Sequence, residues 1–249
     1  MKRLPGVTAL LFALGGTTAM AAEITVLSAG AVEPGLAKLA EQFQRETGHQ
    51  VKIQFGTAPQ LAKRLSDGDA ADILIAPPGV IEEQVKSGKI AADGRVTVGR
   101  VGAGVTVRDG MPHPDIATVD ALKRALLGAD SIVYNQASTG IYLEKLFDKL
   151  GIAEALKPKT TRYANGAQVL EHVIKGRGNE IGFGAITEIK LFEPKGLKLV
   201  GPLPAEVQNY TSYTAGIMTS AHSPEVAKEF IRYITTPAAK QMFAATGVD

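Results

Sequence analysis

The sequence predicts an α/β protein with two lobes, each a mostly parallel sheet flanked by helices, joined by two strands that cross between the lobes. Two observations lead to this prediction. First, a strand, a loop of small residues and a helix follow one another three times between residues 24 and 88, which is typical of a parallel sheet. Second, glycine-interrupted extended runs near residues 99–107 and 209–216 lack a helical period, and we interpret them as the two crossings.

The N-terminus carries the pattern of a secretory signal peptide. Lys2 and Arg3 precede an apolar run at 7–14, and the small residues at 19–21 are those that a signal peptidase reads. The apolar run is too short to span a bilayer. We therefore expect residues 1–22 to be removed, the mature chain to be periplasmic, and no part of it to be inserted in a membrane.

Charge and cysteine content exclude several classes of function. The leader takes with it two of the 27 basic residues and none of the 25 acidic ones, which leaves a neutral mature chain. A neutral surface gives no support for nucleic-acid binding. With no cysteine, disulfides, cysteine catalysis and cysteine-ligated metal are excluded.

The first three units have clear boundary residues. Pro34 fits a first helical turn, and Gly48 and Gly88 are suited to end helices. Because the carboxyl ends of parallel strands build the ligand site in such sheets, we expect the three small-residue loops to lie at one edge. The predicted strands are 24–27, 51–55 and 72–76, and their loops are 28–31, 56–59 and 77–79.

The second half repeats this pattern after an extended run at 96–107. Thr118 is suited to cap one helix, and Ser138 and Thr139 to cap another that ends at Gly151. Free amides at the start of this second helix, next to a strand end, form an anion cradle. Further strands are predicted at 132–134, 161–163, 181–185, 197–200 and 213–218. Further helices are predicted at 119–127, after Gly166 with an end at 176–178, at 224–234, and from 237 onward.

These elements give the expected domain organisation. The first part of lobe 1 covers residues 23–100, lobe 2 covers 101–210, and residues 211–249 return to lobe 1. A search for catalytic chemistry finds none: the four histidines lie far apart in the sequence and are expected at the surface, and no nucleophile or phosphate-binding motif is present. We therefore predict no enzyme, no catalytic residue, no metal and no cofactor.

An exported, cysteine-free chain with two lobes and two crossings resembles the periplasmic solute-binding proteins of ABC importers. The segments 24–31, 55–62, 71–76 and 139–142 are similar to the molybdate-binding branch. The resemblance implies a type II periplasmic-binding-protein fold, a monomer, a small anionic ligand and an importer permease as partner.

The resemblance also implies an interlobe cleft in which backbone amides and hydroxyls hold an oxyanion. Matched to this sequence, its ligand-binding positions are Gly30, Ala31, Thr57, Ala58, Thr139, Gly140, Asn165 and Ala185. At two of them the hydroxyl usual in the family is missing, since Ala31 stands for a serine and Ala185 for a tyrosine.

The missing hydroxyls favour a different ligand. A hydrogen bond to a charged group contributes about 1.5–3 kcal/mol, so the loss of two would weaken the binding of a tetrahedral dianion by orders of magnitude. We therefore expect an organic acid or a phosphorylated metabolite, with Arg162 as a candidate bidentate contact or else a surface arginine. The alternatives are a molybdate or tungstate binder that uses backbone amides, and a periplasmic sensor subunit.

Overall fold

A computed structural model describes residues 21–249, with the main chain alone at residue 92. The predicted leader therefore falls almost entirely outside the described residues. None of the helices in the described part of the chain is long and apolar enough to cross a membrane.

Nine strands within residues 21–249 pair in the order β2-β1-β3-β9-β4-β7-β5-β6, with β8 also paired to β4. This confirms the α/β prediction. The strands are β1 Glu23–Ala29, β2 Gln50–Gly56, β3 Ile73–Ala76, β4 Ile90–Arg108, β5 Ser131–Asn135, β6 Thr160–Tyr163, β7 Glu180–Ala185, β8 Leu197–Pro202 and β9 Tyr210–Met218.

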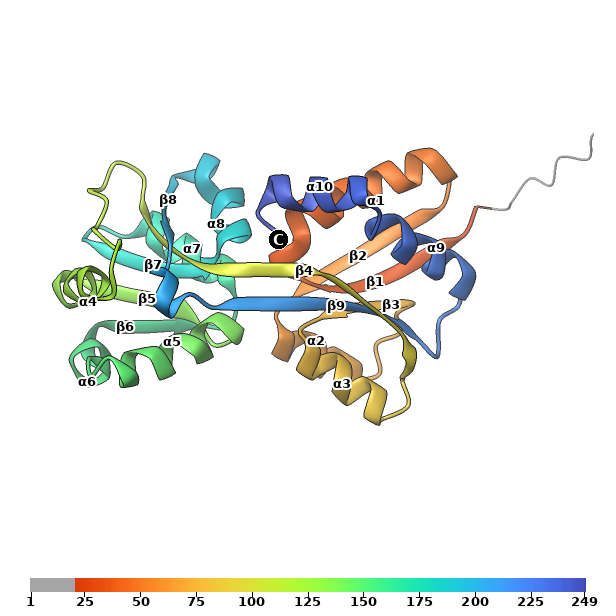
Figure 1. Cartoon of the computed structure of the whole chain (residues 1–249), viewed down its shortest axis with the longest axis horizontal. Coiled ribbons are helices and arrows are strands. Elements are labelled where there is room, and N and C mark those ends of the chain that lie inside the picture. The colour runs from red at the N-terminus through yellow and green to blue at the C-terminus, as the bar shows by residue number, and fades with distance from the viewer. Residues whose placement is uncertain (1–20) are drawn as a thin grey trace, which may run out of the picture.

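Helices cover both faces of the sheet (Figure 1). In lobe 1, α1, α9 and α10 lie on one side of the strands and α2 and α3 on the other. The helices are α1 Glu33–Thr47, α2 Ala58–Ser66, α3 Pro78–Lys86, α4 Val119–Gly128, α5 Ser138–Lys149, α6 Ala153–Leu156, α7 Gly166–Lys175, α8 Ile186–Phe192, α9 Pro224–Ile234 and α10 Pro237–Thr246, with short 3-10 turns η1 Gly30–Val32, η2 Lys157–Lys159, η3 Glu193–Lys195 and η4 Ala205–Val207.

Two parallel trios of strands form the two lobes. β2-β1-β3 is the centre of lobe 1 and β6-β5-β7 the centre of lobe 2. The long strand β4 pairs with β9 as far as Gly102 and with β7 and β8 from Ala103 onward, always antiparallel. β4 and β9 thus run side by side between the lobes, as predicted for the two crossings (Figure 1). The exact lobe limits at 100/101 and 210/211 remain a proposal.

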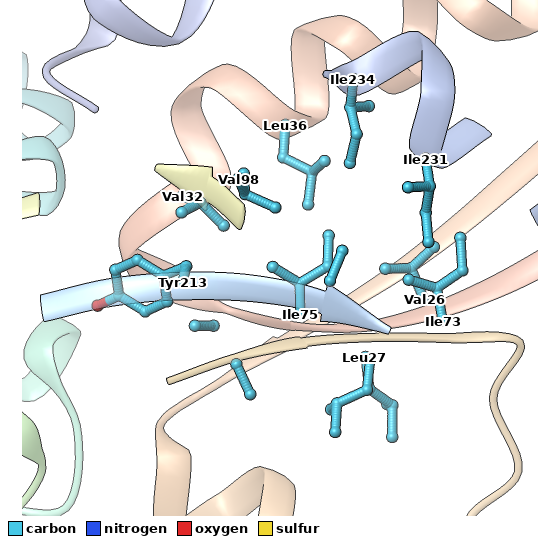
Figure 2. Close-up of a cluster of buried hydrophobic side chains, with 14 of the residues drawn as sticks. Val26, Leu27, Val32, Leu36, Ile73, Ile75, Val98, Tyr213, Ile231 and Ile234 are labelled. Atoms are coloured by element: carbon cyan, nitrogen blue, oxygen red, sulfur yellow. The ribbon is translucent and has the colours of Figure 1, made fainter. Parts of the chain in front are cut away.

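Each lobe has its own apolar core. In lobe 1, side chains of β1 and β3 such as Val26 and Ile75 pack under Leu36 of α1 and Ile234 of α9 (Figure 2). Lobe 2 has two buried clusters, on the two faces of its strands. Ala185, at the end of β7, packs with the lobe 1 cluster, so the two lobes meet at this strand end.

Three local predictions need correction. β4 begins at Ile90, earlier than expected, and the seven-residue helix α8 was not predicted. His49 is not at the surface but 8 % exposed, where its Nδ1 accepts a hydrogen bond from the amide of Ala22. His49, just before β2, is buried because its ring stacks on the ring of Phe43 of α1.

Candidate ligand-binding site

A pocket of about 410 Å³, open mouth included, lies between the ends of the strands of the two lobes. The strand-end loops that line it are those predicted to share one edge. Lobe 1 supplies Ala29, Gly30, Ala31, Thr57, Ala58 and Pro77, and lobe 2 supplies Asn135, Ser138, Thr139, Gly166, Ala185 and Glu188.

The lobe 1 wall is made of small residues and one hydroxyl. Thr57 caps α2: its Oγ1 accepts a hydrogen bond from the amide of Gln60 at 3.5 Å, and the Gln60 side chain accepts one from the amide of Thr57 at 2.8 Å. This capping box uses Thr57 only as an acceptor. Its hydroxyl proton is therefore available to a ligand.

The start of α5 is arranged differently from the prediction. The residue that caps it is Ala137, and neither Ser138 nor Thr139 makes a capping hydrogen bond. Instead, the Asn135 side chain accepts hydrogen bonds from the amides of Ala137 and Gly140, at 2.9 and 3.2 Å. The Gly140 amide is therefore already used inside the protein.

Gly140 has a steric reason to be glycine. A Cβ at this position would lie 1.6 Å from the backbone oxygen of Asn135. Only glycine allows the helix to start so close to the end of β5.

Ser138 and Thr139 present the donors that remain. Both line the pocket, and among the described residues no group accepts a hydrogen bond from their amides or their hydroxyls. Together with the starts of α2 and α7, this helix start gives the pocket an environment that favours an anion.

Three predicted residues do not line the pocket, namely Gly140, Asn165 and Arg162. Asn165 caps α7 by accepting a hydrogen bond from the Gln168 amide at 3.0 Å, and its neighbour Gly166 lines the pocket instead. Arg162 lies in a separate groove beside α5 and α6, where it pairs with Glu144 at 2.5 Å and lies over the Tyr134 ring. No lysine or arginine is among the described residues that line the pocket.

Glu188 was not predicted, and it is the one charged side chain among the described lining residues. It is partly buried, and its carboxyl lies between the two lobes. A Cβ on Gly30 would be 3.1 Å from its Oε1, and a Cβ on Gly166 would be 2.3 Å from its Oε2. Burial raises the pKa of Glu188 to about 7, the charge of Glu33 raises it too, and a hydrogen bond from the Ala185 backbone opposes the shift.

Tyr213 of β9 is a second lining residue that sequence reasoning placed on a strand but not in the site. It is 6 % exposed, and its hydroxyl end points away from the apolar cluster of lobe 1 (Figure 2). Burial raises its pKa above the usual range, and the charge of Glu188 adds to this, against a hydrogen bond with Thr211. At neutral pH Tyr213 is therefore a neutral hydroxyl.

One buried hydrogen bond joins the lobes beside the pocket. The Thr187 hydroxyl of α8 donates to the backbone oxygen of Ala31 at 2.6 Å. It places the first turn of α8, and with it Glu188, against the start of lobe 1.

Comparisons with known proteins agree with this geometry. A family described as bacterial extracellular solute-binding protein matches residues 24–249. The chain is 28 % identical to an aconitate isomerase from a Pseudomonas species, covering 99 % of this chain and 96 % of the relative.

Molybdate-binding proteins are similar as well. The molybdate-binding protein ModA of Azotobacter vinelandii is 26 % identical, covering 97 % of this chain and 95 % of that one. The solved structure of the Azotobacter vinelandii periplasmic molybdate-binding protein superposes with a TM-score of 0.74 at 19 % identity, covering 91 % of this chain and 98 % of that chain.

Proposed function

Because the chain belongs to the bacterial extracellular solute-binding protein family, we propose that it captures a small organic acid between its lobes and delivers it to an ABC importer. The observation that carries this proposal is the start of α5. Four donors of Ser138 and Thr139, two amides and two hydroxyls, line the pocket without a partner among the described residues. An anion that accepts these hydrogen bonds satisfies them.

The lack of two hydroxyl donors is our reason to favour an organic acid over a tetrahedral oxyanion. Ala31 and Ala185 line the pocket with methyl groups, so the expected pair of hydroxyl donors is absent from those positions. Since one relative of nearly full length is named an aconitate isomerase, an unsaturated tricarboxylic acid is a reasonable member of the ligand class. Phosphorylated metabolites, molybdate and tungstate are the competing ligands.

We also propose a periplasmic location and an importer permease as the partner of this protein. We expect residues 1–22 to direct export to the periplasm, and the mature protein to act as a monomer that presents its closed form to a permease. Binding favours the closed form only through contacts that both lobes make with the ligand. Genes for a permease and an ATPase beside this one would support an importer, whereas a sensor kinase there would favour a sensor subunit.

A thermal-shift screen tests the ligand class. The dialysed protein is heated with cis- and trans-aconitate, citrate, phosphoenolpyruvate, sulfate, molybdate and tungstate. We expect the largest rise in Tm with a carboxylic acid, and none in a variant with Ser138→Ala and Thr139→Val. A rise with molybdate or tungstate alone would rule out the organic acid.

Capture and delivery need no turnover, in keeping with the prediction that the chain is not an enzyme. A second candidate function is isomerisation of an unsaturated acid, and two observations favour it. One relative is named for such a reaction, and an ionisable carboxyl, Glu188, lies in the pocket. Incubation of each aconitate isomer with the protein, followed by NMR, separates the two candidates: an unchanged acid supports capture alone.

A further inference from the structure

We propose that Glu188 is a proton-transfer residue, which takes a proton from one carbon of a bound unsaturated acid and returns it to another. The inference rests on the second candidate function and assigns its acid–base group. It starts from an apparent misfit, because a pocket proposed to bind an anion carries a carboxyl and, among its described lining residues, no cation.

The position of the carboxyl is built by both lobes. Gly30 of lobe 1 and Gly166 of lobe 2 leave the space it fills, since a Cβ on Gly166 would lie 2.3 Å from Oε2. Both glycines line the pocket with it. The carboxyl therefore lies where a ligand between the lobes contacts it.

A purely structural role accounts for only part of this arrangement. Glu188 is the third residue of α8, and it accepts a hydrogen bond from the backbone of Ala185, which precedes the helix. A glutamine makes the same capping contact. Capping does not require an ionisable group, so substitution by glutamine separates the two roles.

The groups that face Glu188 keep it able to change its protonation state. Burial raises the pKa of Glu188, and the charge of Glu33 of α1 raises it further. Burial also raises the pKa of Glu33, an effect that Lys195 of η3 opposes, and Tyr213 of β9 is neutral at pH 7. No cation is among the groups that shift the pKa of Glu188 itself, which is about 7. Both forms are therefore populated near neutral pH, as general acid–base catalysis requires.

The reaction is a balanced shift of one proton. The Glu188 carboxylate takes a proton from a CH₂ group that lies between a carboxylate and a C=C bond. The C–H electron pair forms a new C=C bond, and the charge moves through the old double bond onto a carboxylate of the acid. Glu188 then returns the proton to the far carbon, so no electron donor or acceptor is needed.

The start of α5 can stabilise the charge that develops. Ser138 and Thr139 line the pocket, and their amides and hydroxyls have no hydrogen-bond partner among the described residues. Preorganised donors of this kind stabilise an oxyanion in the transition state. The neutral hydroxyl of Tyr213 is a further donor at the same pocket.

Deuterium exchange tests the proposal directly. Wild-type protein is incubated with trans-aconitate in D₂O, and proton NMR follows loss of the CH₂ and vinyl signals and appearance of the cis isomer. We expect exchange to fall by about 10²-fold or more in E188Q, in the range of acid–base effects, while calorimetry still detects binding. E33Q is the matched control: it keeps the exchange, and its pH–rate profile moves to lower pH.

Each other outcome has a definite meaning. Binding of the acid without exchange in the wild type overturns this inference and leaves capture intact. Exchange that E188Q retains also overturns it. Absence of binding of any carboxylic acid overturns the proposed function itself.

Discussion

In lobe 1 the strand trio β2-β1-β3 ends in loops of small residues, whereas in lobe 2 the same topology, β6-β5-β7, ends in loops that carry hydrogen-bond donors and a carboxyl. Both sets of loops meet at one pocket. Gly30, Ala31 and Ala58 form the wall from lobe 1, and Ser138, Thr139 and Glu188 face it from lobe 2.

This difference implies that the two lobes have different roles in ligand binding. We expect a ligand to gain most of its directed hydrogen bonds from lobe 2, and lobe 1 to close over it with its shape and with the hydroxyls of Thr57 and Tyr213. Substitutions in lobe 2 should therefore change affinity and chemistry, and those in lobe 1 should change closure.

The largest effect is expected at Gly140. In Gly140→Ala the new Cβ meets the Asn135 backbone oxygen at 1.6 Å, so the start of α5 must move away from β5. We expect ligand binding to be lost and the free energy of unfolding to fall by about 3 kcal/mol or more, as measured by urea denaturation.

Gly79→Ala in lobe 1 is the control for this substitution. A Cβ there meets no atom within 4 Å, so its free energy of unfolding should change by no more than about 0.5 kcal/mol. Equal effects of the two substitutions would contradict the steric explanation.

The next effect concerns the donors of α5. Ser138→Ala and Thr139→Val each remove one hydroxyl. We expect each to raise the Kd for the ligand by about 10- to 100-fold, since a hydrogen bond to a charged group contributes about 1.5–3 kcal/mol. Calorimetry gives the affinity. Thr57→Ser in lobe 1 keeps both the hydroxyl and the helix cap, so this variant should bind the ligand with the wild-type Kd. An unchanged Kd in both lobe 2 variants would show that lobe 2 does not supply most of the hydrogen bonds to the ligand.

A pH effect should distinguish Glu188 from every lobe 1 residue of the pocket. Its pKa is about 7 in the folded protein against 4.5 ordinarily, so the folded state holds this proton more tightly than the unfolded state. The contribution of Glu188 to the free energy of unfolding is therefore largest at low pH and is lost as pH rises from about 4.5 to about 7.

Glu188→Gln removes this loss. The free energy of unfolding of this variant, relative to wild type, should rise between about pH 4.5 and about pH 7 and then stay level. The rise should be at most about 3 kcal/mol, and smaller because solvent screens the partly exposed carboxyl. Urea denaturation at pH 5, 6, 7 and 8 measures it. A difference that does not vary with pH would argue against a titrating carboxyl.

A smaller effect is expected where the lobes touch. Thr187→Val leaves the Ala31 carbonyl without its 2.6 Å hydrogen bond, and we expect a loss of about 1–2 kcal/mol. Thr187→Ser, which keeps the hydroxyl, should lose less. The two variants are compared by thermal unfolding, and equal losses would mean that the methyl group matters and the hydrogen bond does not.

The smallest effect is expected outside the pocket. Arg162 and Glu144 form a pair whose side chains are 33 % and 43 % exposed, so Arg162→Ala should cost no more than about 1 kcal/mol of stability. It should leave ligand affinity unchanged in a titration. A tenfold loss of affinity would mean that Arg162 does contribute to ligand binding.

The sequence was sufficient to predict all nine strands of the described part of the chain in order, the two crossings and the edge at which the pocket lies, but not the short helices α6 and α8. The predicted features depend on regular signals, namely apolar periodicity, small residues after strands and glycine at helix ends. Gly30, Ala31, Thr57, Ala58, Thr139 and Ala185 line the pocket as expected.

The chemistry of the pocket was harder to predict. Glu188 lies on a seven-residue helix, too short for a helical period to stand out. Arg162 is on a correctly predicted strand, but it pairs in register with Tyr134 and reaches Glu144 on α5. Which way a side chain points from the short edge strand β6 is set by tertiary packing. Tyr213 lies on the central strand β9, and its place in the pocket depends on how the two lobes come together.

We propose that the pocket between the lobes binds a small organic acid through donors of lobe 2. One calorimetric titration tests it: dialysed wild-type protein and the Ser138→Ala, Thr139→Val double variant are each titrated with trans-aconitate and with molybdate. We expect one aconitate per wild-type chain, at least 100-fold weaker binding in the double variant, and little heat from molybdate. Tight binding of molybdate alone, or equal affinity for aconitate in both proteins, would contradict it.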